Sequence, residues 1–117
     1  MKLVSHGTYD SRQQALTEAM LRAIKRELQA VDVPPELVEQ LTGSIAFAVT
    51  SLLDDVASIE VEGEALSPVV TFQVAEDELA FACGNSWMHE YVYRLLPAVF
   101  ATADGEKNAP TNAREDS

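Results

Sequence analysis

The stretch from Pro34 to Glu62, PPELVEQLTGSIAFAVTSLLDDVASIEVE, decides the fold class, because its hydrophobic period changes along the way. Up to about Ala57, apolar residues recur every three or four positions, which predicts a helix that begins after the Pro34-Pro35 pair. From Ser58 to Glu62, polar and apolar residues alternate, which predicts a strand with one solvated face. A helical period followed at once by a strand period indicates an α+β domain.

The chain before this stretch predicts a first helix, over about Thr8 to Val31. Its apolar residues recur at helical spacing, and we expect the core-facing stripe to consist of Leu16, Met20, Ile24, Leu28 and Val31. In the second helix, the stripe expected to face the core is Leu37, Leu41, Ile45, Ala48, Leu52 and Val56. A short proline turn joins the two helices, which predicts an antiparallel helical hairpin.

The chain after Glu62 predicts two more strands and a last helix. One strand should begin just after Pro68, since proline cannot donate to a strand ladder. A hairpin loop at 75–77 should connect it to a third strand that ends at Cys83. Three sequential strands with short turns predict an antiparallel meander, one face of which is covered by helices. The last helix should begin near Ser86.

These elements give a two-layer α+β fold in the order α-α-β-β-β-α. We expect a single domain over residues 1–103. From residue 104 onward the chain is small, polar or charged, which predicts a disordered tail over 104–117.

The charge of the chain is strongly negative and unevenly distributed. The formal net charge is −11, and no Lys or Arg occurs between Arg26 and Arg94. Such a surface repels nucleic acid and anionic membranes, and it would attract a basic protein. We find no secretory signal or membrane-spanning stretch, and a lone cysteine cannot form an internal disulfide, so we expect a cytoplasmic protein.

Two surfaces are candidates for binding a partner. The first is the apolar side of the last helix, where the large aromatics Trp87 and Tyr91 lie one turn apart. The second is an acidic rim at the two hairpin turns, made of Glu60, Glu62, Glu64, Glu76, Asp77 and Glu78. The helices carry more apolar surface than three short strands can cover, which favours a homodimer or a groove for another protein.

Catalytic and cofactor motifs are absent from the sequence. The five glycines are scattered singly, so there is no phosphate-binding loop, and one Cys with two His is too few for a zinc site. The alternative to a binding module is a small-ligand or thiol-dependent enzyme with a pocket near Cys83, Asn85 and His89, the residue types of a thiol nucleophile with its base and orienting group. We favour a non-enzymatic protein-binding or regulatory module, with no cofactor, metal or catalytic residue assigned.

Overall fold

A computed structural model describes residues 1–82 and 84–105 of the chain and confirms the α+β class. The elements in chain order are β1 (Lys2–Ser5), α1 (Tyr9–Ala30), α2 (Pro35–Leu53), β2 (Glu60–Val61), β3 (Glu64–Ala65), β4 (Phe72–Ala75), β5 (Glu78–Phe81) and α3 (Met88–Gly105). The three helices lie where their apolar periods predicted them, within a few residues. Cys83 and residues 106–117 lie outside the described residues, so the prediction of a disordered tail stays a prediction there.

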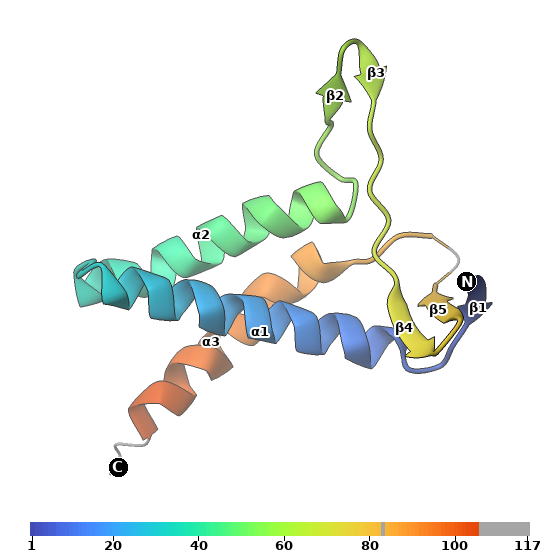
Figure 1. The fold of residues 1–117 in the computed structure, drawn as a ribbon. Helices are drawn as coiled ribbons and strands as arrows, with labels where there is room; N and C mark the ends of the chain where they lie inside the picture. Colours follow the sequence, from blue (N-terminus) through green and yellow to red (C-terminus); the bar gives the residue numbers. More distant parts are fainter. Residues whose placement is uncertain (83, 106–117) are drawn as a thin grey trace.

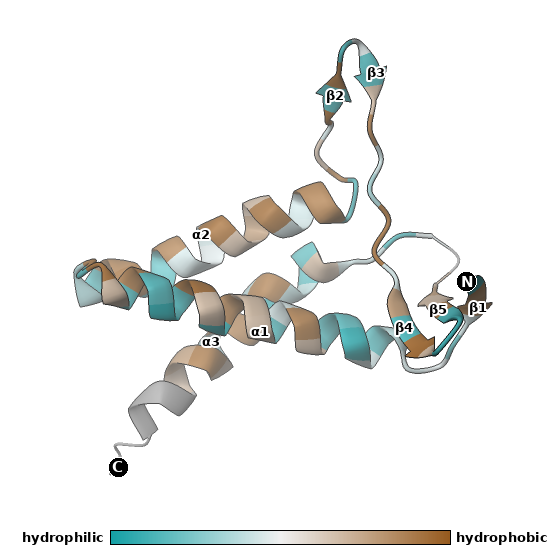
Figure 2. Cartoon of the chain, viewed as in Figure 1, coloured by the Kyte–Doolittle hydropathy of each residue, from teal (hydrophilic) through white to brown (hydrophobic). Residues whose placement is uncertain are grey.

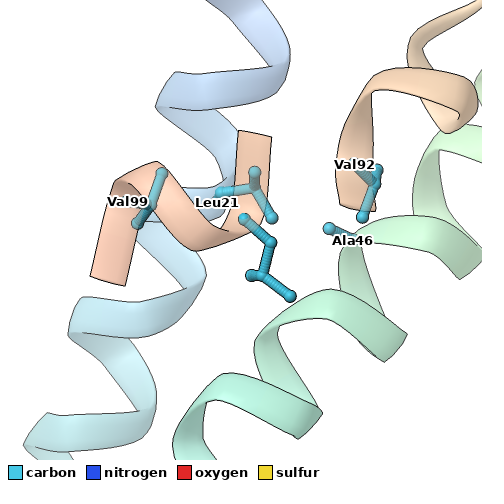
Figure 3. Packing of buried hydrophobic residues seen from close by; sticks show 5 residues of the cluster. Leu21, Ala46, Val92 and Val99 are labelled. Atoms are coloured by element: carbon cyan, nitrogen blue, oxygen red, sulfur yellow. The ribbon is translucent and has the colours of Figure 1, made fainter. Parts of the chain in front are cut away.

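The core lies between the three helices, each of which packs against the other two. Its buried cluster consists of Leu21, Ala46, Val92, Leu96 and Val99 (Figure 3). Helix α2 approaches α3 closely at Gly43, where an added Cβ would lie 2.9 Å from side-chain atoms of Leu96 and Tyr93. A residue without a side chain at this position therefore lets the two backbones come together.

Helices α1 and α2 turn different faces to the core from those expected. Helix α1 buries Tyr9, Gln13, Thr17, Leu21 and Lys25, whereas the predicted stripe that begins at Leu16 is displaced by one position. The polar members of this inner face find hydrogen-bond acceptors: the Thr17 hydroxyl donates to the Gln13 carbonyl (2.8 Å) and the Lys25 ammonium to the Val99 carbonyl (3.3 Å). The helical period of α1 was therefore predicted correctly, but the face that it turns to the core was not, because polar residues occupy part of that face.

The strands are arranged differently from the predicted meander. Strands β4 and β5 form the expected antiparallel hairpin, but the third strand of their sheet is β1, which pairs parallel to β5. The segment around Glu60 pairs instead with β3 in a separate two-stranded sheet. The turn explains this pairing, because Glu62 and Gly63 both have positive φ (52° and 83°), as tight two-residue hairpin loops require.

The expected covering of the sheet by helices is also wrong. The sheet β1-β5-β4 lies beside the N-terminal end of α1, and the helices cover one another (Figure 1). Tyr9 makes the connection: its ring lies 5.2 Å from that of Phe72, and its hydroxyl donates to the Val70 carbonyl (2.6 Å). Among the described strand residues only Ala80 is fully buried. The helices therefore supply most of the core.

Candidate functional site

A buried carboxylate at the end of α2 holds the start of α3 in place. Asp54 accepts hydrogen bonds from the His89 backbone N–H (2.7 Å) and the Ser86 hydroxyl, and its other contact is the His89 Nδ1 (2.6 Å). Helix N-termini carry unpaired N–H groups and a partial positive charge. A carboxylate accepts hydrogen bonds from these groups, and its negative charge is stabilised there. Asp54 is thus a cap for α3 supplied by a different helix.

Two amide side chains complete this attachment. The Trp87 backbone N–H donates to Gln13 Oε1 on α1 at 2.7 Å. Asn85 connects to two other segments: its Oδ1 accepts from the Val70 N–H (3.1 Å) and its Nδ2 donates to the Pro68 carbonyl (2.5 Å) in the loop before β4, and Nδ2 also donates to the Leu53 carbonyl (3.3 Å) at the end of α2. The first turn of α3 is therefore fixed from both neighbouring helices and from the loop before β4.

This polar network contains Ser, His and Asp, but its order is not that of a hydrolase triad. In a triad the serine hydroxyl bonds to the histidine, which in turn bonds to the aspartate. Here the Ser86 hydroxyl bonds to Asp54 directly, and Ser86 is buried. The arrangement positions a helix, and its geometry supports no acyl transfer.

Around His89 the network supports an exposed aromatic patch, formed by Phe47, Trp87, His89 and Tyr93. The His89 ring lies 5.8 Å from the Trp87 ring and 6.1 Å from the Phe47 ring, and Phe47 lies 5.8 Å from Tyr93. These separations are typical of interacting aromatic pairs. Yet 57% of Trp87, 55% of Tyr93 and 40% of Phe47 remain exposed. The chain thus holds a cluster of large rings at its surface.

Tyr91 lies beside the patch in a shallow pocket of about 360 Å³. Its hydroxyl donates to Asp10 at 2.5 Å, and the Arg94 guanidinium lies over its ring at 4.9 Å. The hydrogen bond from Tyr91 is the main reason why the pKa of Asp10 lies below its ordinary value, and the same bond raises the pKa of Tyr91. The pocket is lined by Asp10, Gln13, Trp87, Glu90, Tyr91 and Arg94.

The structure divides the acidic rim that the sequence suggested. Glu60, Glu62 and Glu64 belong to the β2–β3 hairpin, whereas the acids at 76–78 lie at the β4–β5 turn of the other sheet. Figure 1 shows the two turns at separate places on the molecule. The six acids therefore form two separate acidic turns, and they do not make one continuous surface.

The comparisons with known proteins give no relative: no family model matches the chain, and neither a curated protein nor a solved structure is similar to it. Within residues 1–82 and 84–105, no group of three or more His, Cys, Asp or Glu side chains is placed to hold a metal ion. No helix in the same described part is long and apolar enough to cross a membrane.

The thiol hypothesis stays a prediction, because Cys83 lies outside the described residues. The structure does assign other contacts to its two expected helpers. Asn85 bonds to backbone groups of Val70, Leu53 and Pro68, and His89 contacts Asp54 through Nδ1.

Sequence reasoning missed Asp54, Gln13 and Phe47. A local view of the sequence indicates only that Asp54 lies at a polar helix end, and it offers no sign that the partner of this side chain lies 35 positions away. Phe47 lies in the uncharged middle of α2, which is apolar nearly all round, and this pattern fits the core of the domain and an interface equally well. The available signal was the surplus of large apolar residues in that helix, which could not all be buried at once.

Proposed function

We propose that this chain is a non-catalytic protein-binding module that holds a basic segment of another protein at the aromatic patch. The observation that carries the proposal is the exposure of Trp87, Tyr93 and Phe47 around His89. Tryptophan and tyrosine are among the residue types that contribute most to binding at protein interfaces. Solvated rings that already contact one another offer a partner large apolar contacts in a fixed arrangement.

The attachment of α3 supports the same proposal, because it makes the patch rigid before binding. Asp54 fixes the backbone and the ring of His89, and Gln13 fixes the backbone at Trp87. Groups that are ordered beforehand lose little conformational entropy when a partner binds. A partner would therefore gain nearly the full value of its contacts with these rings.

Charge supports a basic partner. The chain carries a net charge of −11, and the exposed Glu90 lines the pocket beside Trp87. A Lys or Arg side chain can stack on an indole ring while its charge approaches a nearby carboxylate. The negative field of the whole chain would also speed the encounter with a basic segment.

Selection from a random peptide library against the full chain tests the proposal. We expect the selected peptides to be basic and to change the fluorescence of Trp87, the single tryptophan of the chain. By calorimetry, Trp87→Ala should weaken their binding by about tenfold or more, as at interface hot spots. The matched control is Val31→Ala, an exposed apolar position at the far end of α1, which should leave the affinity unchanged. Peptides that bind Trp87→Ala and Tyr93→Ala as tightly as the unaltered chain would overturn the proposal.

A further inference from the structure

Helix α2 presents most of its large apolar side chains to solvent, and small or polar residues make up most of its core-facing side, with Val38 the buried exception. Thr42, Ala46 and Thr50 are fully buried. By contrast, 42% of Leu37, 38% of Ile45 and 42% of Leu52 are exposed. A helix of a complete globular unit buries its large apolar stripe, so the opposite arrangement leaves an outer face that lacks its cover. Figure 2 shows hydrophobic residues along this helix. We define the α2 outer face as the middle stripe of this exposed side, and the exposed Phe47 and Val49 lie on its two flanks. The α2 outer face consists of Leu37, Leu41, Ser44, Ile45, Ala48 and Leu52.

The spacing of this outer face is the same when it is read from either end. The steps between successive members are four, three, one, three and four positions, with the midpoint between Ser44 and Ile45. Two antiparallel copies of α2 that cross at this midpoint would place Leu41 against the small Ala48 and Ile45 against the small Ser44. A two-fold interface requires this kind of self-complementarity: if one residue of the first copy contacts a second residue of the other copy, the same contact occurs with the copies exchanged.

The charge pattern favours a second copy over a basic partner as the occupant of this face. No charged residue occurs from Gln40 to Leu53, while the chain as a whole carries −11. Two copies of so acidic a chain repel one another wherever their acids meet, so a self-contact is favoured only on an uncharged face. A basic partner would gain nothing from this face and would bind where the acids are.

The β2–β3 hairpin lies next to the outer face but outside this contact, because it carries Glu60, Glu62 and Glu64. It follows the C-terminal end of α2 and projects on the side of α2 that is turned away from α1 and α3 (Figure 1). Its strands have two residues each, and its large apolar residues Val61 and Leu66 are exposed. An isolated hairpin of this size is marginally stable in water, so it needs a surface to lie on. The N-terminal end of a partner's α2 is not that surface, because it carries Glu36 and Glu39, which would repel the acids of the hairpin.

We propose that the α2 outer face is the interface of an antiparallel, two-fold homodimer. The aromatic patch takes no part in this contact, apart from lying on the flank of the same helix at Phe47. The dimer and the binding of a basic partner are therefore separate properties, and each has its own test.

Light scattering and sedimentation of the full chain across a dilution series give the first test. We expect a species of twice the 12.8 kDa chain mass that dissociates on dilution. Ala48→Glu places a charge in the outer face, against Leu41 of the second copy, and should weaken the dimer by about a hundredfold, because an unpaired charge would be buried. Ala15→Glu is the matched control, since it makes the same change at an exposed position of α1. A chain that is monomeric at every concentration would overturn the proposal, as would a dimer equally stable in both variants.

Cysteine cross-linking in a Cys83→Ser background tests the register and does not depend on how Ala48→Glu folds. Ser44→Cys lies next to the two-fold axis and should form a disulfide-linked dimer on mild oxidation. Leu37→Cys alone should not, but a mixture of Leu37→Cys and Leu52→Cys chains should cross-link. Efficient self-linking by Leu37→Cys would mean that the helices run parallel and would contradict the antiparallel arrangement.

Discussion

At the scale of single residues, Asp54 shows how one buried carboxylate can decide where a helix begins. Its side chain is reached by the His89 N–H and the Ser86 hydroxyl, and it contacts His89 Nδ1. We predict that Asp54→Ala lowers the free energy of unfolding by about 2 kcal/mol or more, because a helix cap and charge-assisted hydrogen bonds are lost together. Urea denaturation measures this.

The neighbouring acid supplies the control for that prediction. Asp55 is exposed and has a positive φ of 62°, which asparagine also tolerates. Asp55→Asn should therefore change the free energy of unfolding by less than about 0.5 kcal/mol. Equal midpoints for Asp54→Ala and Asp55→Asn would show that the capping contacts contribute no stability.

The hydrogen bond between Tyr91 and Asp10 can be tested by measuring the pKa of the Asp10 carboxyl group. The pKa of Asp10 lies below its ordinary value chiefly because Tyr91 donates to it, with help from Gln13. A lowered pKa in the folded state means that the bond stabilises the fold above pH 3.8, and this stability is lost as the pH falls through the lower, folded-state value. We predict that Tyr91→Phe moves the pKa of Asp10 partway up toward 3.8, measured by NMR of the carboxyl carbon.

Tyr93→Phe is the matched control for this titration, because Tyr93 is exposed and lies on the same helix. It should leave the pKa of Asp10 where it is. An Asp10 titration that is identical in the unaltered chain and in Tyr91→Phe would contradict the assigned hydrogen bond.

At the scale of elements, the positions of the helices could be predicted, but the inner faces of α1 and α2 could not. The apolar period places α1 and α2 correctly, since both carry apolar residues at helical spacing on more than one side. The choice between faces depends on contacts that lie far away in the sequence. Gln13 is inside because it accepts the Trp87 N–H, and Gly43 is inside because α3 approaches it.

The strands were harder to predict because they are short and largely exposed. β1 has four residues and leaves little alternation of apolar and polar side chains, so nothing in the sequence marks it as a partner of β5. The β4–β5 hairpin was predictable, since its turn is bounded by two alternating runs. The candidate site was predictable to the same extent. Trp87 could be predicted as a binding residue from its size, whereas the supporting role of Asp54 depends on contacts far away in the sequence.

The inner face of α2 carries a prediction of its own. The hydroxyl of the buried Thr42 has no hydrogen-bond partner among the described residues, whereas that of Thr50 donates to the Ala46 carbonyl at 2.8 Å. Removing an unsatisfied buried hydroxyl is favourable, so Thr42→Val should raise the free energy of unfolding by about 1 kcal/mol. Thr50→Val makes the same change where the hydroxyl is bonded and should give no gain. Thermal denaturation compares the two variants, and an equal effect of both would refute this account of the α2 inner face.

At the scale of the whole molecule, the two proposed surfaces should respond to salt in opposite directions. The α2 outer face is uncharged, but it must bring together two chains of net charge −11. Raising the ionic strength from about 0.01 M to about 0.1 M shortens the screening length from about 30 Å to about 10 Å. Repulsion between the copies is then weaker, so the homodimer should tighten, by about tenfold in the dissociation constant, which corresponds to about 1.4 kcal/mol.

Binding of a basic peptide at the aromatic patch should weaken over the same range, because screening reduces the attraction between opposite charges. Sedimentation gives the dimer constant and Trp87 fluorescence gives the peptide constant, both in the same salt series. Opposite changes of the two dissociation constants would separate the two interfaces. The dimer forms through an apolar face against the repulsion between the chains, whereas the peptide is attracted by the negative charge of the chain. A dimer that weakens with salt would place charged groups inside its interface, which the uncharged stretch from Gln40 to Leu53 does not contain.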